Sequence, residues 1–284
     1  MTTIAVTGAS GFLGRQVVSA LRSGGFEARG LDVVAAVDGT GTVVDLADPD
    51  ATRAALEGCS GVVHLAGYPR AGDHTPHDVF TTNTSIAFSV VDGAVDAGVS
   101  TLLFVSSISV IGYPFFTHPI RPAHLPLDEA IASVPQDPYG LSKWVGESIV
   151  DAAVARSGGA MGAVSLRFPA LHTPESFVAE MPATYSTGKA AKLLWSYIDT
   201  RDAAEACASV FTRQRTGHTK LFLAAPDTFD PRPTEELLAE HFPDVPLSLP
   251  VFGNASLMNS AAAIDVLGFT PRHSWREYPG TEAR

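Results

Sequence analysis

Three glycines near the N-terminus, Gly8, Gly11 and Gly14, constrain the fold of this chain more than any other feature. They follow the apolar run IAV at residues 4–6, and RQVV at residues 15–18 then starts a helical pattern. A strand, a tight glycine turn and a helix N-terminus make a site for a pyrophosphate, because the backbone can approach closely and free N–H groups donate to the anion. A strand–helix turn that binds no ligand is the alternative. The other residues of this predicted cofactor-binding turn are Ser10, Phe12 and Leu13.

An acidic residue, Asp32, ends the second predicted strand at residues 27–32. An acid at this place can accept hydrogen bonds from both hydroxyl groups of an adenosine ribose, and it would repel a 2′-phosphate. Asp32 therefore favours NAD over NADP as the cofactor. Arg15 is the one nearby residue that could hold a 2′-phosphate, and an aspartate that only caps the next turn is the alternative interpretation.

Predicted strands alternate with predicted helices along the first part of the chain. This order indicates α/β structure of the Rossmann type, a doubly wound parallel sheet with right-handed crossovers. The apolar run at residues 61–67 is typical of a strand buried on both faces. Asp48 followed by Pro49 predicts the start of a helix. Two more strands are expected at residues 42–46 and 100–105, and a helix at 83–98.

Composition narrows the class of protein. The 284 residues are 45% hydrophobic and carry a formal charge of −11 without a lysine- or arginine-rich run. We therefore expect a small-molecule substrate and neither nucleic acid nor a membrane as a partner. The two cysteines, Cys59 and Cys207, are expected to be buried thiols, and no metal is expected. Residues 1–14 are expected to form a strand and loop rather than a signal peptide, and no apolar run approaches membrane-spanning length, so we expect a cytoplasmic protein.

Tyr139 and Lys143 form a candidate catalytic pair. Pro138 opens a predicted helix that runs to about residue 156, and a spacing of four places the two side chains on one helix face. A tyrosine with an ordinary pKa of about 10 is a poor base, but an ammonium group one turn away and a positive nicotinamide ring would lower that pKa. Ser107 follows a predicted strand, and ligands bind at the strand ends of an open sheet. A surface pair with an extended lysine is the alternative for Tyr139 and Lys143.

Several motifs resemble those of the extended short-chain dehydrogenase/reductases, the NAD-dependent epimerase/dehydratase family, and they cover most of the chain. They are TGASGFLG at residues 7–14, DL at 45–46, HLAG at 64–67, SS at 106–107, Tyr139-x-x-x-Lys143, LRFP at 166–169 and YIDTRDAA at 197–204.

This resemblance implies roles for individual residues. Ser107 would polarise the substrate oxygen, Tyr139 would be the acid/base, and Lys143 would bind the nicotinamide ribose. His64 is expected to pack behind the cofactor rather than take part in chemistry. A homodimer through the helices at 83–98 and 139–156 is also implied. The resemblance also implies that Asp45 and Leu46 lie against adenine. Besides Tyr139 and Lys143, the other residues implied around the cofactor are Leu65, Ala66, Gly67 and Asn83.

The sequence departs from the family pattern mainly on the substrate side. ISVIG at residues 108–112 replaces the usual xxVYG, and ALHTP at 170–174 replaces a YGP-like run. The stretch 113–138 contains six prolines and can be neither a regular helix nor a central strand. We expect it either to border the active site or to be a surface excursion packed by its own aromatic rings.

These observations predict a Rossmann domain at residues 1–170 and a small substrate-binding portion at 171–284. The predicted function is NAD-dependent hydride transfer to or from a carbinol carbon of a sugar-like or other polar alcohol or ketone. An NAD-dependent epimerase of sugars or nucleotide sugars would use the same three residues and stays open. A non-catalytic NAD-binding sensor is the contrasting class, but it would not need Ser107, Tyr139 and Lys143 together.

Overall fold

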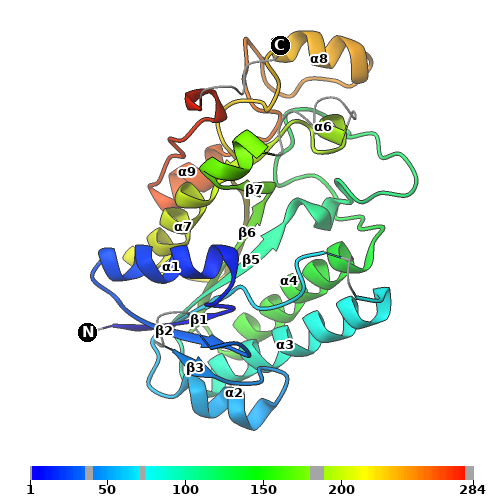
Figure 1. The fold of residues 1–284 in the computed structure, drawn as a ribbon. Helices are drawn as coiled ribbons and strands as arrows, with labels where there is room; N and C mark the ends of the chain where they lie inside the picture. Colours follow the sequence, from blue (N-terminus) through cyan, green and yellow to red (C-terminus); the bar gives the residue numbers. More distant parts are fainter. Residues whose placement is uncertain (1, 36–40, 71–73, 180–188, 279–284) are drawn as a thin grey trace.

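A parallel sheet lies at the centre of the molecule (Figure 1). The computed structural model describes residues 2–35, 41–70, 74–179 and 189–278. In these residues seven strands form one sheet in the order β3-β2-β1-β4-β5-β6-β9, and every neighbouring pair is parallel. The order changes direction between β1 and β4, as in a doubly wound Rossmann sheet, which confirms the predicted fold class. The strands are β1 (Thr3–Thr7), β2 (Glu27–Asp32), β3 (Thr42–Val43), β4 (Gly61–His64), β5 (Thr101–Ser107), β6 (Gly162–Phe168) and β9 (His218–Phe222).

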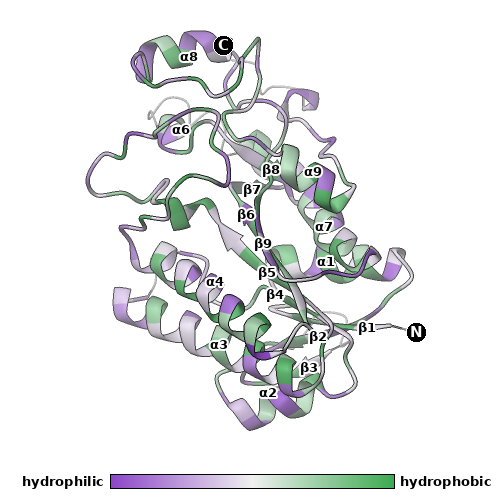
Figure 2. Cartoon of the chain, turned by 180° about the vertical axis from the view of Figure 1, so that it is seen from behind, coloured by the Kyte–Doolittle hydropathy of each residue, from purple (hydrophilic) through white to green (hydrophobic). Residues whose placement is uncertain are grey.

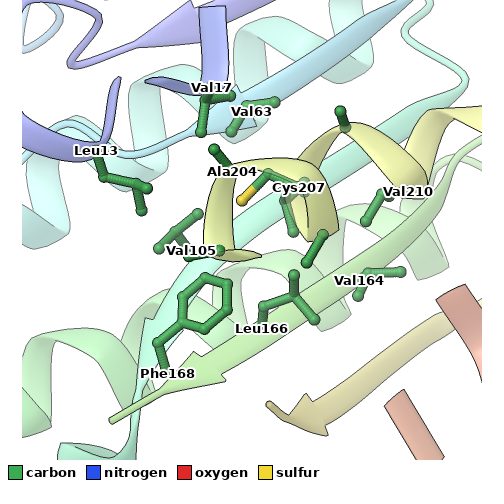
Figure 3. Packing of buried hydrophobic residues seen from close by; sticks show 14 of the residues in the cluster. Leu13, Val17, Val63, Val105, Val164, Leu166, Phe168, Ala204, Cys207 and Val210 are labelled. Carbon is green, nitrogen blue, oxygen red and sulfur yellow. The ribbon is translucent and has the colours of Figure 1, made fainter. Parts of the chain in front are cut away.

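Helices cover both faces of the sheet (Figure 1). One face packs against α1 (Phe12–Ser23), α7 (Thr200–Ser209) and α9 (Ala261–Leu267), and the other against α2 (Pro49–Leu56), α3 (Pro76–Asp96) and α4 (Pro138–Arg156). The first of these two interfaces is shown in Figure 3, where side chains from α1 and α7 meet those of β4, β5 and β6. Its members include Val17, Val63, Val105, Val164, Leu166, Ala204 and Cys207.

Two helices begin where the sequence predicts them. The Asp48 carboxylate caps α2, and the Asp137 carboxylate caps α4 by accepting from the backbone N–H groups of Tyr139 and Gly140, both at 2.9 Å. A proline occupies the first helical position in each case. The helix predicted at 83–98 begins earlier, at Pro76, because Thr75 caps it there. It ends at Asp96.

Two strands are shorter than predicted. β3 ends at Val43, because the Asp45 carboxylate accepts from the backbone N–H of Ala47 at 2.9 Å and starts a turn. β4 ends at His64, because the next two backbone N–H groups donate to the Thr7 hydroxyl instead of to a neighbouring strand. In contrast, β5 runs on to Ser107, which becomes its last residue.

A second hydrophobic core lies beyond the carboxyl ends of β5 and β6. We call this part the cap; it comprises residues 108–137, 170–179, 189–199 and 223–259. Its elements are β7 (Ala170–His172), α6 (Lys189–Lys192), β8 (Tyr197–Asp199) and α8 (Thr234–His241), with β7 and β8 paired in parallel. The loop 113–138 belongs to it, since Leu125 N–H donates to Pro246 O at 3.0 Å and Leu127 N–H to Leu257 O at 2.8 Å.

The chain returns from the cap to the sheet. After β8 it forms α7, which packs on α1, and then β9, which pairs with β6. The division of the chain into 1–170 and 171–284 therefore stays a prediction. The second of these parts contributes the helices α7 and α9 and the strand β9 to the sheet layers.

Burial follows the hydropathy of the sequence. Figure 2 shows hydrophobic residues along the central strands and alternating hydrophobic and hydrophilic residues on the helices that cover them. Cys59 and Cys207 are buried free thiols, as expected. Among the helices of the described ranges, none is long and apolar enough to cross a membrane.

Candidate active site

Three consecutive residues at the end of β5 are each tied to a different residue of α4. The Lys143 ammonium group donates to the Val105 carbonyl oxygen at 2.8 Å. The Ser106 hydroxyl donates to the Glu147 carboxylate at 2.7 Å, and Ser107 shares a hydrogen bond with the Tyr139 hydroxyl. Tyr139, Lys143 and Glu147 are four residues apart, so one face of α4 carries all three contacts. The structure thus brings together the three predicted catalytic residues.

Burial dominates the electrostatics of Tyr139. Loss of solvent raises the pKa of Tyr139 to about 12, the hydrogen bond with Ser107 opposes that rise, and the Asp137 carboxylate adds to it. Burial likewise lowers the pKa of Lys143 to about 8, against the attraction of Glu147. The Lys143 ammonium lies 5.8 Å from the centre of the Tyr139 ring. The protein alone therefore leaves Tyr139 a weak base, and a further positive charge beside the ring is needed to lower its pKa.

The Ser107 side chain is held by its own turn. Its oxygen caps the short 3₁₀ helix at Ile108–Ile111 by accepting from Ser109 N–H at 3.1 Å. The hydroxyl groups of Ser107 and Ser109 are 3.0 Å apart. These contacts keep Ser107 at the carboxyl end of β5, beside Tyr139.

The glycine turn between β1 and α1 has the close packing that its sequence predicts. Gly8 has a φ of +70°, and a Cβ there would lie 2.9 Å from the backbone nitrogen of Ala66. A Cβ on Gly14 would overlap the Gly8 carbonyl oxygen. Gly11 precedes α1 and offers no side-chain cap, and no acidic residue lies in the first turn. The first N–H groups of α1, at Phe12, Leu13 and Gly14, are therefore available to an anion.

Asp32 lies beside this turn. Its carboxylate accepts from the backbone N–H groups of Ser10 at 2.9 Å and Val34 at 3.2 Å. Asp32 therefore caps the turn that follows β2, as the alternative interpretation expects. Its hydrogen bond with Ser10 also connects it to the glycine turn. The exposed guanidinium of Arg15 donates to the Ser10 carbonyl oxygen on the same turn.

The remaining predicted cofactor residues lie around the same strand ends. Asp45 is exposed and Leu46 is buried. Leu65 and Ala66 donate their backbone N–H groups to the Thr7 hydroxyl at 3.1 and 3.2 Å. Gly67 packs directly against Asn83, since a Cβ on it would lie 2.8 Å from the Asn83 amide oxygen.

Asn83 connects two segments of the site. Its side-chain amide accepts from Tyr68 N–H at 2.7 Å and donates to Tyr68 O at 3.0 Å. It also donates to the Ser142 hydroxyl at 3.2 Å, and that hydroxyl donates to the Tyr139 carbonyl oxygen at 2.7 Å. Asn83 therefore joins the segment after β4 to the first turn of α4.

His64 is buried and neutral. The Thr7 oxygen accepts from the two backbone N–H groups that follow His64, so its own hydrogen points to His64 Nδ1, 2.9 Å away. The ring proton is therefore on Nε2. Burial, with the nearby Lys143 charge, lowers the pKa of His64 to about 3.

The loop 113–138 reaches Tyr139, the predicted acid/base. The Phe115 ring meets the Tyr139 ring edge to face at a centroid distance of 6.4 Å. The Tyr113 hydroxyl donates to Ile120 O at 2.8 Å and closes the base of the loop. Of the two expectations for this loop, the structure favours the one in which it borders the site. On the cap side of the loop is a cavity of about 300 Å³, whose lining includes Phe116, Lys192 and His241.

The sequence motifs assign no role to Glu147 or Arg167, although Arg167 lies in the LRFP motif. Both are buried, at 1% and 4% exposure, and form a two-point ion pair behind Ser106 and Lys143. Continuing the four-residue spacing from Tyr139 through Lys143 would have reached Glu147. Within the described ranges no group of three metal-ligating side chains is present.

The chain matches known proteins over most of its length. The model of the NAD dependent epimerase/dehydratase family matches residues 4–224. The L-arabinose 1-dehydrogenase (NAD(P)(+)) of Haloferax volcanii is 30% identical over 207 residues, which is 69% of this chain and 77% of the relative. The UDP-glucose 4-epimerase of Azospirillum brasilense is 27% identical over 176 residues, 58% of this chain and 48% of the relative.

A solved structure shares the fold. A short-chain dehydrogenase/reductase superfamily protein from Agrobacterium tumefaciens, crystallised with bound NAD, superposes with a TM-score of 0.70 at 24% identity and covers 96% of this chain and 94% of its own. The family match spans β1 to β9 and includes the glycine turn, Ser107, Tyr139 and Lys143. The chain belongs to the NAD dependent epimerase/dehydratase family.

Proposed function

We propose that this protein is an NAD-dependent oxidoreductase that acts on a carbinol carbon of a sugar or similar polar alcohol or ketone. The observation that carries the proposal is the contact of Ser107 with Tyr139 at the carboxyl end of β5, with Lys143 one turn behind. The same edge of the sheet carries the glycine turn. Family membership and the dehydrogenase and epimerase relatives support it.

The residues present fit NAD. The glycine turn leaves no room for a Cβ at Gly8 or Gly14, and the start of α1 has free donors and no acidic side chain. A pyrophosphate suits this place, and Asp32 beside it suits an unphosphorylated ribose. Bound NAD would accept or return a hydride and bring a positive nicotinamide ring close to Tyr139.

The proposed roles of the side chains follow from their contacts. Tyr139 removes the hydroxyl proton of the substrate during oxidation and returns a proton during reduction. Ser107 donates a hydrogen bond to the same oxygen and keeps it next to Tyr139. The Lys143 ammonium favours the phenolate form of Tyr139 and binds the ribose.

Turnover assays with Tyr139→Phe test this proposal. The wild type is incubated with NAD and with L-arabinose, glucose 6-phosphate, uronates and UDP-glucose, and both NADH and the sugar products are measured. We expect NADH to form and Tyr139→Phe to lower kcat by about 10² or more. Tyr278→Phe is the matched control, because Tyr278 lies near the C-terminal end of the described residues and its hydroxyl accepts a hydrogen bond from Arg201. Full activity of Tyr139→Phe would refute the mechanism.

The same assay separates the alternatives. A sugar product without net NADH identifies an epimerase, which would use the same three residues. A wild type that binds NAD but converts none of the substrates supports the sensor.

We further propose that the protein forms a homodimer through the outer faces of α3 and α4. Phe88 is 55% exposed on α3, and Trp144 and Leu141 are 43% and 36% exposed on α4. Val90, in contrast, belongs to the core of the chain. Analytical ultracentrifugation of the wild type and of Trp144→Glu tests this. We expect the wild type to be a dimer and the variant to be a monomer, and a monomeric wild type would refute the proposal.

A further inference from the structure

A buried ion pair lies directly behind the proposed catalytic residues. Arg167 Nε and Nη2 donate to the two carboxylate oxygens of Glu147 at 2.9 and 2.7 Å. The Ser106 hydroxyl donates to the first of these oxygens at 2.7 Å. Arg167 also lies over the Phe222 ring of β9, 5.2 Å from its centre. Both charges are thus enclosed by β5, β6, β9 and α4.

The position of this pair relates it to the reaction. Glu147 is one helical turn beyond Lys143, on the α4 face that carries Tyr139. Ser106 lies between Val105, whose carbonyl holds Lys143, and Ser107. Ser106 and Arg167 are register partners on neighbouring strands. One carboxylate therefore connects the helix that holds the acid/base to the strand end that holds Ser107.

Stability alone is a weak explanation for such a pair. Buried ion pairs can often be replaced by apolar residues of similar volume without loss of stability, although removing one partner is costly. A carboxylate whose two oxygens are occupied by Arg167 and Ser106 cannot turn to form an ion pair with Lys143. Its charge stays at a constant distance behind that ammonium.

We propose that Glu147 is a positioning residue of the reaction: held by Arg167 and Ser106, it fixes a negative charge behind Lys143 and holds the end of β5 against α4. This proposal rests on the proposed function. Glu147 raises the pKa of Lys143 against the lowering by burial. It thereby keeps Lys143 charged near neutral pH, where that charge favours the Tyr139 phenolate.

The other charged groups around Lys143 are few in the described part of the chain. Tyr139 faces it from α4, and His64 from β4 interacts with it but stays neutral. Arg167 on β6 forms an ion pair with Glu147 and acts on Lys143 through that carboxylate. His218 on β9 interacts with Glu147, and burial lowers its pKa. Glu147 is the one group that raises the pKa of Lys143.

The first experiment titrates Lys143 itself and does not depend on turnover. The chain has four lysines, so NMR of protein labelled at the lysine side chain is tractable, and Lys143→Arg assigns the signal. We expect a midpoint near pH 8 in the wild type. In Glu147→Gln and in the double variant Glu147→Gln/Arg167→Met, it should fall by about one unit or more. The double variant removes both charges of the Glu147–Arg167 pair, so neither of these two residues is left as an unpaired buried charge.

The second experiment follows the pH dependence of kcat for alcohol oxidation. With Lys143 less charged, the Tyr139 phenolate is less favoured, so the acid limb should move to higher pH in the double variant. Asp92→Asn/Arg156→Met is the matched control, because it removes an exposed ion pair between α3 and α4. A folded double variant with a wild-type Lys143 midpoint and a wild-type pH profile would overturn the proposal. Absence of turnover in the wild type would overturn the proposed function and leave the titration to decide the role of Glu147.

Discussion

The Thr7 hydroxyl donates its hydrogen to His64 Nδ1 across the neighbouring strands β1 and β4. The ring is buried at the sheet edge where the glycine turn begins, and its pKa is lowered to about 3. This contact needs an unprotonated Nδ1, so the folded protein holds His64 neutral while the unfolded chain takes up a proton below its ordinary pKa of about 6.5.

Acid should therefore destabilise the protein through His64. The stability that the neutral ring contributes is complete above pH 6.5 and is lost as the pH falls from 6.5 toward 3. His64→Asn keeps an acceptor for Thr7 but does not titrate. Between pH 6.5 and 5 we expect the free energy of unfolding from urea titrations to fall more steeply in the wild type, by up to about 1.4 kcal/mol per pH unit. Parallel pH dependences in the two proteins would contradict this.

Cofactor preference should follow Asp32. Its carboxylate lies at the glycine turn, where a 2′-phosphate would meet a negative charge. We expect NADH to bind more tightly than NADPH, and Asp32→Ser to reduce that preference by about tenfold or more. Fluorescence titrations with both nucleotides measure the dissociation constants. Asp50→Asn, which removes an exposed carboxylate on α2, should leave the ratio unchanged.

A methyl group at Gly14 should disrupt the turn. A Cβ at this position overlaps the Gly8 carbonyl oxygen and approaches the Ala9 Cα to 2.9 Å. We expect Gly14→Ala to lower the free energy of unfolding by about 1–3 kcal/mol and to weaken NAD binding. Gly24→Ala, at the other end of α1, meets only ordinary contacts of 3.4 Å or more and is the control. Urea denaturation and calorimetric NAD titration would show the difference, and equal behaviour of the two variants would argue against close packing at the turn.

Phe115 should affect the substrate more than the cofactor. Its ring packs edge to face on Tyr139 from the loop 113–138. We expect Phe115→Ala to lower kcat/KM by about three- to tenfold, with little change in the dissociation constant of NAD. Phe252→Ala removes a ring that is 76% exposed and serves as the control. An unchanged kcat/KM would show that the loop does not shape the substrate side.

Local sequence patterns were sufficient to predict the glycine turn and the start of α4. A glycine turn requires close backbone approach, and a capping aspartate followed by proline starts α4, so the places of Gly8, Gly14 and Tyr139 follow from neighbours in the sequence. The fold class followed in the same way, because alternating strands and helices allow few topologies.

The cap and the ion pair could not be predicted from local patterns. Glu147 and Arg167 are 20 residues apart, and they meet only because β5 and β6 pair in the register that places Ser106 beside Arg167. The loop 113–138 has no periodic pattern, and its position depends on backbone hydrogen bonds to residues 246–259. The charge balance at Tyr139 also differs from the expectation, since burial raises its pKa to about 12 and outweighs the local contacts.

The route of the chain between sheet and cap limits how the site can open. The polypeptide leaves the sheet after β5 and after β6, returns through α4 and α7, and leaves again after β9 before α9 packs back on the sheet. Rotation about a single linker, as in two domains joined in series, would have to bend all of these connections together. Opening of the site by a hinge at one linker is therefore disfavoured, and the segment that carries Phe115 packs directly on Tyr139.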